Sequence, residues 1–204
     1  MLSILLKHSA VAAVTDSVVY SSSFAFKPGV YLNYEQFRNN QPVGKDQLLS
    51  DYNPADLDYV RKIVISGAVR YKDEKGNEVK VNASALWGFS ENNAVYIRFN
   101  SDFNRIMVMG SVCHFTATVT TYMSTGPTNM GGTYGTPVQS SQQFLLDTQT
   151  GKILDYNQGN VVYILQRDPA LYAEYSALKK RKRKELMFYY IRKYNDRHPL
   201  KFRA

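Results

Sequence analysis

The sequence predicts an α+β protein in which an antiparallel β meander closes into a small barrel or sandwich and is followed by one long C-terminal α-helix. In the middle of the chain, turn-forming clusters recur roughly every ten residues between runs rich in Val, Ile, Tyr and Phe, which is typical of strands joined by hairpins. After residue 167 the pattern changes, because Asp168-Pro169 is a strong helix start.

The length of 204 residues and the apolar content of 44% indicate a single folded domain. Within it we distinguish three segments: an irregular N-terminal segment (1–58), an antiparallel β segment (59–166) and a basic amphipathic helix (167–204). In the first segment, "PGVYLNYEQFRNNQP" predicts a turn at Pro28-Gly29 and a short helix from Tyr34 to Asn39.

The β segment is predicted from seven apolar runs. In "AVYIRF", the side chains of Val95, Ile97 and Phe99 alternate with those of Tyr96 and Arg98, so one face of this strand is expected to be solvated. The other runs expected to form strands are "YVRKIVISGAVRY", "EVKVNASALWGF", "RIMVMGSVCHFTATVTTY", "QFLLDT", "KILDY" and "NVVYIL".

The C-terminal helix is predicted to run from Pro169 to about Asn195. Six consecutive cations, residues 179–184, surround such a helix completely, so this turn must be solvated or paired with anions. They are the candidate polyanion-binding residues: Lys179, Lys180, Arg181, Lys182, Arg183 and Lys184.

The run "LMFYYI" that follows the cations is apolar all round. Phe188 and Ile191 face away from the main apolar stripe of the helix and therefore need a second covering surface. We expect them to contact a partner. The N-terminal segment, another subunit and a membrane interface are the alternatives for that surface.

The formal net charge of +8 lies entirely in the C-terminal segment. Residues 167–204 hold twelve Lys and Arg against four Asp and Glu, whereas the rest of the chain holds thirteen of each sign. Nucleic-acid binding is therefore possible but disfavoured, because typical binders spread cations over a docking face. Peripheral contact with an anionic membrane is a further alternative.

No catalytic, metal or cofactor site is predicted. The three histidines, His8, His114 and His198, are too scattered for a metal-ligand pattern. Cys113 lies next to His114, and neighbouring side chains of a strand point to opposite faces, so the two cannot act as nucleophile and base. We expect the Cys113 thiol to be buried and unreactive, although a pairing with a distant residue stays open.

Three weaker patterns have a functional and a structural explanation each. Asp51, Asp56 and Asp58 lack the spacing of a calcium loop and favour helix capping and loop solvation. "MGGTYG" lacks the ending of a phosphate loop and favours a hairpin loop. Trp87 and the sixteen tyrosines suit either a recognition platform or, as we favour, a β core.

The N-terminus has features of a degenerate signal peptide. The apolar run Leu2 to Leu6 is interrupted by Lys7 and His8, and Ala10-Val11-Ala12 fits cleavage by a signal peptidase. No apolar run is long enough to predict a transmembrane span.

Three stretches resemble a group of uncharacterised exported proteins of Bacteroidota: "GVYLNYEQFRNNQP", "LWGFSENNAVYI", and the ending from "DPALYAEY" to "YIRKYNDRHPL". The resemblance covers most of the chain. It implies a periplasmic or cell-envelope location, with the cytoplasm as the alternative, and it lends no catalytic residues.

The sequence thus favours a non-enzymatic interaction or structural protein of the cell envelope, acting on an unknown protein partner or as a homo-oligomer. The alternative function is binding of a polyanion, either nucleic acid or anionic lipid, through residues 179–184. An enzyme is the least favoured class.

Overall fold

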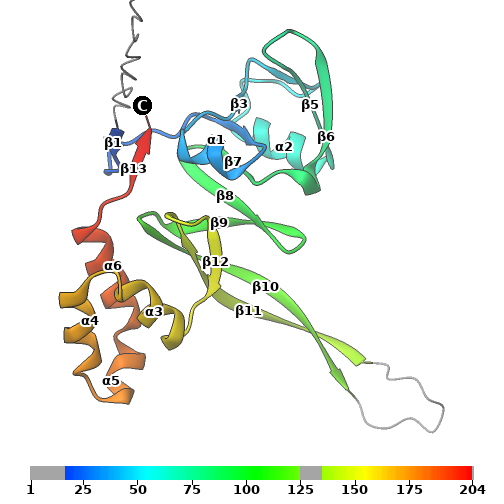
Figure 1. The fold of residues 1–204 in the computed structure, drawn as a ribbon. Helices are drawn as coiled ribbons and strands as arrows, with labels where there is room; N and C mark the ends of the chain where they lie inside the picture. Colours follow the sequence, from blue (N-terminus) through cyan, green and yellow to red (C-terminus); the bar gives the residue numbers. More distant parts are fainter. Residues whose placement is uncertain (1–16, 125–134, 204) are drawn as a thin grey trace, which may run out of the picture.

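The protein is α+β, as predicted (Figure 1). The computed structural model describes residues 17–124 and 135–203. The largest sheet has eight antiparallel strands in the order β12-β11-β10-β9-β8-β7-β2-β3. This sheet is curled into a half-barrel, and its edge strands β12 and β3 do not pair with each other. Its strands are β2 (Gly29–Tyr31), β3 (Val43–Gly44), β7 (Gly88–Glu91), β8 (Ala94–Phe99), β9 (Asp102–Val108), β10 (Val112–Ser124), β11 (Gly135–Asp147) and β12 (Lys152–Asp155).

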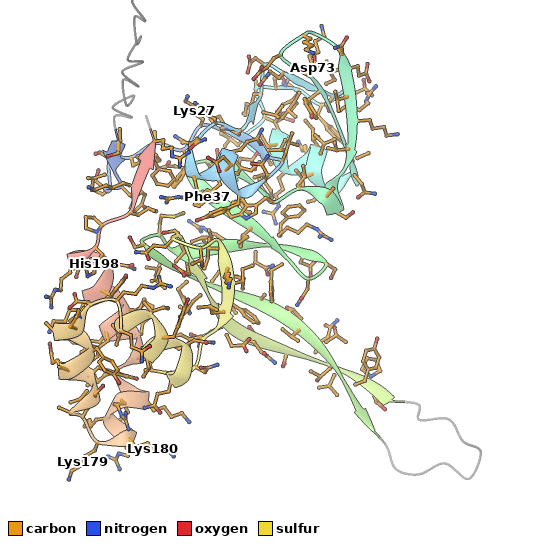
Figure 2. All side chains as sticks on the ribbon, in the orientation of Figure 1. Lys27, Phe37, Asp73, Lys179, Lys180 and His198 are labelled. Carbon is orange, nitrogen blue, oxygen red and sulfur yellow. The ribbon has the colours of Figure 1, made fainter. Side chains whose placement is uncertain are left out.

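The main core contains the residues that one face of the curled sheet buries. Val95 and Ile97 of β8 belong to it, whereas Tyr96 and Arg98 do not, which confirms the alternation predicted for this strand. Trp87 packs against the same core and stacks on Phe37 with ring centroids 4.5 Å apart. Trp87 is therefore a packing residue. Figure 2 shows Phe37 between its helix and the sheet.

Helix α1 (Tyr34–Arg38) confirms the short helix predicted for the N-terminal segment. The side chain of Asn33 caps it by accepting a hydrogen bond of 3.0 Å from the backbone N–H of Gln36. Phe37 is fully buried. The Asn33 cap and the burial of Phe37 together stabilise this short helix.

Residues 59–65 form helix α2 (Tyr59–Ile65), so the strand predicted for this stretch is wrong. The apolar spacing is helical after all, since Val60, Ile63 and Val64 are all buried on one face. The start of the helix is satisfied by a distant side chain, because the Glu91 carboxylate accepts from the N–H of Val60 at 2.8 Å. The helix packs on a three-stranded sheet of β4 (Leu48–Leu49), β5 (Ala68–Lys72) and β6 (Glu78–Asn82), which is followed by the short 3-10 helix η1 (Ala83–Ala85).

The run "NVVYIL", expected to be a strand, is helix α3 (Gln158–Leu165). The Asn157 side chain accepts from the N–H of Asn160 at 2.9 Å and starts the helix. Its buried residues Val161, Ile164 and Leu165 belong to a second core beneath the sheet, which they share with the C-terminal helices. This burial on a helical surface overrides the β propensity of the valines.

The predicted single helix from Pro169 to Asn195 is instead three helices: α4 (Pro169–Ser176), α5 (Lys180–Glu185) and α6 (Met187–Arg197). The start is as predicted, because Asp168 caps α4 by accepting from the N–H of Leu171 at 3.0 Å. The chain then turns back, so that Tyr175 of α4 contacts Tyr190 of α6 with ring centroids 4.9 Å apart. A single straight helix would lack this contact.

Beyond α6, the chain pairs with its own beginning. Strand β13 (Lys201–Arg203) lies antiparallel to β1 (Ser17–Val19). Phe202 of β13 is buried in the main core.

Candidate interaction site

Strands β10 and β11 extend beyond the strands on either side of them. Within the described part of the chain, β9 pairs with β10 only at His114 and Phe115, and β12 pairs with β11 only from Phe144 to Asp147. We call the remaining residues 116–122 and 136–143 the arm. Figure 1 shows that it projects away from the body of the molecule and from the C-terminal helices.

The register of the hairpin shows which backbone groups point outward. The N–H of Thr148 donates to the carbonyl of Ser111 at the base of the pair, so every second residue from there bonds across to the other strand. The residues between them point their N–H and C=O groups to the outside of the hairpin. On β10 these outward residues are Thr116, Thr118, Thr120 and Tyr122.

The two outer edges of the arm differ in their hydrogen-bonding capacity. On β11 the outward residues are Pro137, Gln139, Ser141 and Gln143. Pro137 has no N–H, and the carbonyl of Gln143 already accepts from the N–H of Tyr156 at 3.0 Å. Proline on a strand edge blocks the addition of a further strand. The outer edge of β10 has no such block and is the edge that a further strand can join.

The arm carries no charged side chain. Asp, Glu, Lys and Arg are absent from residues 106–146 of the sequence. The exposed edge therefore lacks the charges that commonly prevent strands from pairing between molecules. Tyr122, at 74% exposure, is the most exposed aromatic residue of the arm, and Val138 is 38% exposed. An isolated two-stranded ribbon of this kind is only marginally stable in water, so a third strand would stabilise it.

The C-terminal segment holds the base of the arm. The Asn195 side chain donates to the carbonyl of Val112 at 2.9 Å and accepts from its N–H at 2.8 Å. On the facing strand, Arg167 forms two hydrogen bonds to the Asp147 carboxylate, at 2.9 and 2.7 Å. Burial alone would raise the pKa of Asp147, but the bonds from Arg167 and Thr150 hold this pKa below its usual value. The direction of the arm is therefore fixed relative to the C-terminal helices.

The candidate catalytic residues do not converge. Cys113 is fully buried, as predicted, and burial raises the pKa of its thiol to about 12. His114 bonds to Gln143 at 2.9 Å, and His198 bonds to Asp168 at 2.8 Å. Both contacts join elements of the fold. Within residues 17–124 and 135–203, no group of three or more His, Cys, Asp and Glu could hold a metal ion.

Of the six cations at residues 179–184, Lys179 directly precedes α5 and the other five lie in it. No residue of α5 is buried. Arg181 and Lys182 form ion pairs with Glu185, at 3.1 and 2.9 Å. Figure 2 shows Lys179 and Lys180 at the end of the helical group farthest from His198. The cations thus form a small surface of their own, away from the arm (Figure 1).

Phe188 and Ile191, the predicted partner contacts, have different surroundings. Ile191 is completely buried in the second core, which α3, α4 and the sheet supply. The second covering surface thus comes from the same chain, and none of the three alternatives is needed for Ile191. Phe188 is half-buried and contacts the His114 ring edge-on, with centroids 5.4 Å apart.

The weaker sequence patterns have structural roles where they are described. Asp56 and Asp58 both pair with Lys62 of α2, at 2.7 and 3.0 Å, but the Asp58 side chain makes no capping hydrogen bond. Asp51 is an exposed loop residue, as expected for loop solvation. Most of the "MGGTYG" stretch lies outside the described residues, as does the N-terminal run with His8. No described helix is both long and apolar enough to cross a lipid bilayer.

The fold and the arm define a class of α+β proteins with a half-barrel sheet, a long projecting hairpin and a C-terminal helical group. The chain belongs to DUF6563, a family of unknown function, whose pattern matches residues 29–198. The matched range includes the main sheet, the arm and all the C-terminal helices. Comparison with curated proteins and with solved structures gives no match.

Sequence reasoning missed the arm as a site. Its signal is the charge-free run from residue 106 to 146, which is long for a chain in which 21% of the residues are charged. Pro137 lies in none of the predicted strands, so it marks a strand edge only once residues 135–147 are known to form β11. The contacts of Asn195 with Val112 and of Arg167 with Asp147 have no sequence signal, because the paired residues lie 83 and 20 positions apart in the chain.

Proposed function

We propose that this protein is a non-enzymatic interaction protein that binds an extended segment of a partner polypeptide along the outer edge of β10. The unpaired edge at Thr118, Thr120 and Tyr122 carries this proposal. An added strand would bond to the outward N–H and C=O groups of these three residues, which all point to the same side of β10.

The arm suits polypeptide better than a charged ligand. Its exposed side chains are those of Thr, Ser, Gln, Tyr, Pro and Val, none of which is charged, so they repel neither sign of charge on an added strand. Specificity would come from the side chains beside the edge, among them the exposed Tyr122.

Site-specific photo-crosslinking tests the proposal. A benzoylphenylalanine in place of Thr118 should capture one partner in intact cells, and mass spectrometry should identify it. The added variant Thr120→Pro removes one outward N–H and should abolish the crosslink, whereas Gln139→Pro makes the same change on the opposite edge and should retain it. Equal crosslinking in both proline variants, or no crosslink at all, would contradict edge pairing. A crosslink to a second copy would make the partner this protein itself.

We further propose a periplasmic or cell-envelope location. The apolar run from Leu2 to Leu6 with the small residues Ala10, Val11 and Ala12 supports it, as does the resemblance noted above. Cell fractionation tests it, and recovery of the full-length chain with cytoplasmic markers would contradict it.

Polyanion binding through residues 179–184 is the second candidate function, and it is favoured because no residue of α5 is buried. Six cations on two helical turns create a local positive potential that does not depend on the neutral body. Binding to heparin or to vesicles rich in anionic lipid should then fall steeply with salt.

A further inference from the structure

A cleft lies on the face of the sheet that is turned away from the main core, at a distance from the arm. Helix α2, the start of η1 and strands β7 to β9 surround it. Its volume is about 510 Å³, within the range of about 300–1,000 Å³ that is usual for small-ligand sites.

The floor of the cleft is aromatic. Phe89 and Tyr96 are cross-strand partners whose rings stack with centroids 4.6 Å apart and planes 6° apart. Phe103 meets Phe89 edge-on at 5.4 Å. On the rim, Ile65 of α2 is 72% exposed. This floor is an apolar aromatic surface against which a planar group can pack.

Two arginines line the same cleft. Arg61 of α2 lies over the Tyr96 ring at 5.9 Å, and a guanidinium stacked in this way keeps its N–H donors free at its edges. Arg98 lies opposite Phe103 in the β8–β9 pair. Among the ion pairs formed by the described residues, none includes Arg61 or Arg98.

We propose that this cleft binds a small ligand that carries an oxyanion, carboxylate or phosphate, on a planar apolar body. The planar body packs against Phe103 and the ring edges of the Phe89–Tyr96 stack, while Arg61 and Arg98 donate hydrogen bonds to the oxyanion. Asp102 also lines the cleft and disfavours ligands of high negative charge, which favours a carboxylate over the more highly charged phosphate. The proposal is independent of strand addition at the arm.

Two matched pairs of probes test the chemistry on the full chain. N-acetylphenylalanine and phenyl phosphate carry the two oxyanions, and N-acetylphenylalaninamide and phenol are their uncharged counterparts. Proton–nitrogen NMR spectra should show each bound anion shifting the amides of Gly67, Ser84 and Ser101, which border the cleft. The tighter-binding anion identifies the natural oxyanion. Equal binding of an anion and its neutral counterpart, or no shift with either anion, would overturn the proposal.

Arginine variants test the site. Arg61→Gln and Arg98→Gln should each weaken binding of the better anion about tenfold, the effect of one charge-assisted hydrogen bond. Arg105→Gln is the matched control, because Arg105 pairs with Tyr96 on the same sheet face but does not line the cleft. If Arg105→Gln weakened anion binding as much as the two cleft variants do, the anion would be attracted by the positive charge of the whole sheet face and not by the cleft. Should Arg98→Gln unfold, Arg61→Gln alone decides the result, and Arg98→Lys shows whether a charge without the planar group suffices.

Discussion

Val112 and Asp147 face each other at the base of the arm, and the C-terminal segment binds both of them. Asn195 of α6 holds the backbone of Val112, and Arg167, just before α4, holds the carboxylate of Asp147. These side-chain contacts therefore hold the arm in a fixed position relative to the C-terminal helices, although 83 residues separate Val112 from Asn195.

Replacing Asp147 by Asn should destabilise the protein by about 3 kcal/mol, the lower end of the range for breaking a buried ion pair. The value is at the lower end because the Arg167 side chain is 22% exposed and keeps part of its hydration after the change. Urea unfolding of the variant and of the parent measures the difference. Lys152→Gln, an exposed change on neighbouring β12, is the control and should have little effect. A loss below about 0.5 kcal/mol for Asp147→Asn would show that the pair does not stabilise the fold.

Acid should unfold the protein in part through Asp147. Its pKa is lower in the folded state than in the unfolded chain, where an Asp has a pKa of about 3.9. The ion pair therefore contributes its full stability above about pH 4, and this contribution is lost as the pH falls through the folded pKa. Unfolding free energies between pH 7 and pH 2 should fall less steeply for Asp147→Asn than for the parent. Parallel curves would contradict this assignment.

Cys113 should resist thiol reagents in the native state. Burial raises the pKa of its thiol to about 12, so almost no thiolate is present at neutral pH, and the side chain is fully covered. A maleimide should react at the rate of a small thiol only after urea has unfolded the chain. Fast labelling without denaturant would revive the hypothesis of a nucleophilic cysteine.

Changing all six residues from Lys179 to Lys184 to Gln should leave the fold intact. No residue of α5 is buried, and its two ion pairs with Glu185 are solvent-exposed, so stability should change by no more than about 1 kcal/mol. Thermal melting measures this effect. If the parent binds heparin or anionic vesicles and the variant does not, polyanion binding becomes the leading function.

Ile191→Ala should destabilise the protein by about 2–5 kcal/mol, because it opens a cavity in the core that joins the helices to the sheet. Phe188→Ala should cost less, since Phe188 is half-buried. The melting temperature reports a role in the core, and the mass from gel filtration reports a role in an oligomer contact. A silent Ile191→Ala would mean that α6 does not depend on this core. A Phe188→Ala variant that keeps its stability but changes its mass would make Phe188 an oligomer contact.

The sequence predicts the elements whose signals are local. The short helix at Tyr34 and the start of α4 follow from caps formed by residues three positions away, Asn33 to Gln36 and Asp168 to Leu171. Strand β8 follows from its alternation. These signals involve neighbouring residues and are visible without a tertiary structure.

The errors arise where distant contacts decide the local structure. Helix α2 is short and rich in β-branched residues, and its first N–H groups are satisfied by Glu91, about thirty positions away. The break before α5 depends on the contact between Tyr175 and Tyr190, which local propensity does not contain. The candidate site illustrates the same limit. The charge-free run was visible, but its projection as an arm depends on where β9 and β12 stop pairing.

The pairing of Ser17 with Arg203 places both ends of the described chain at one corner of the molecule, whereas the arm points in another direction (Figure 1). A tether at either end would hold the protein by the same corner. A surface anchor, a fused reporter or an immobilisation tag joined at Ser17 or at Arg203 would then leave the molecule at the same corner, away from the arm.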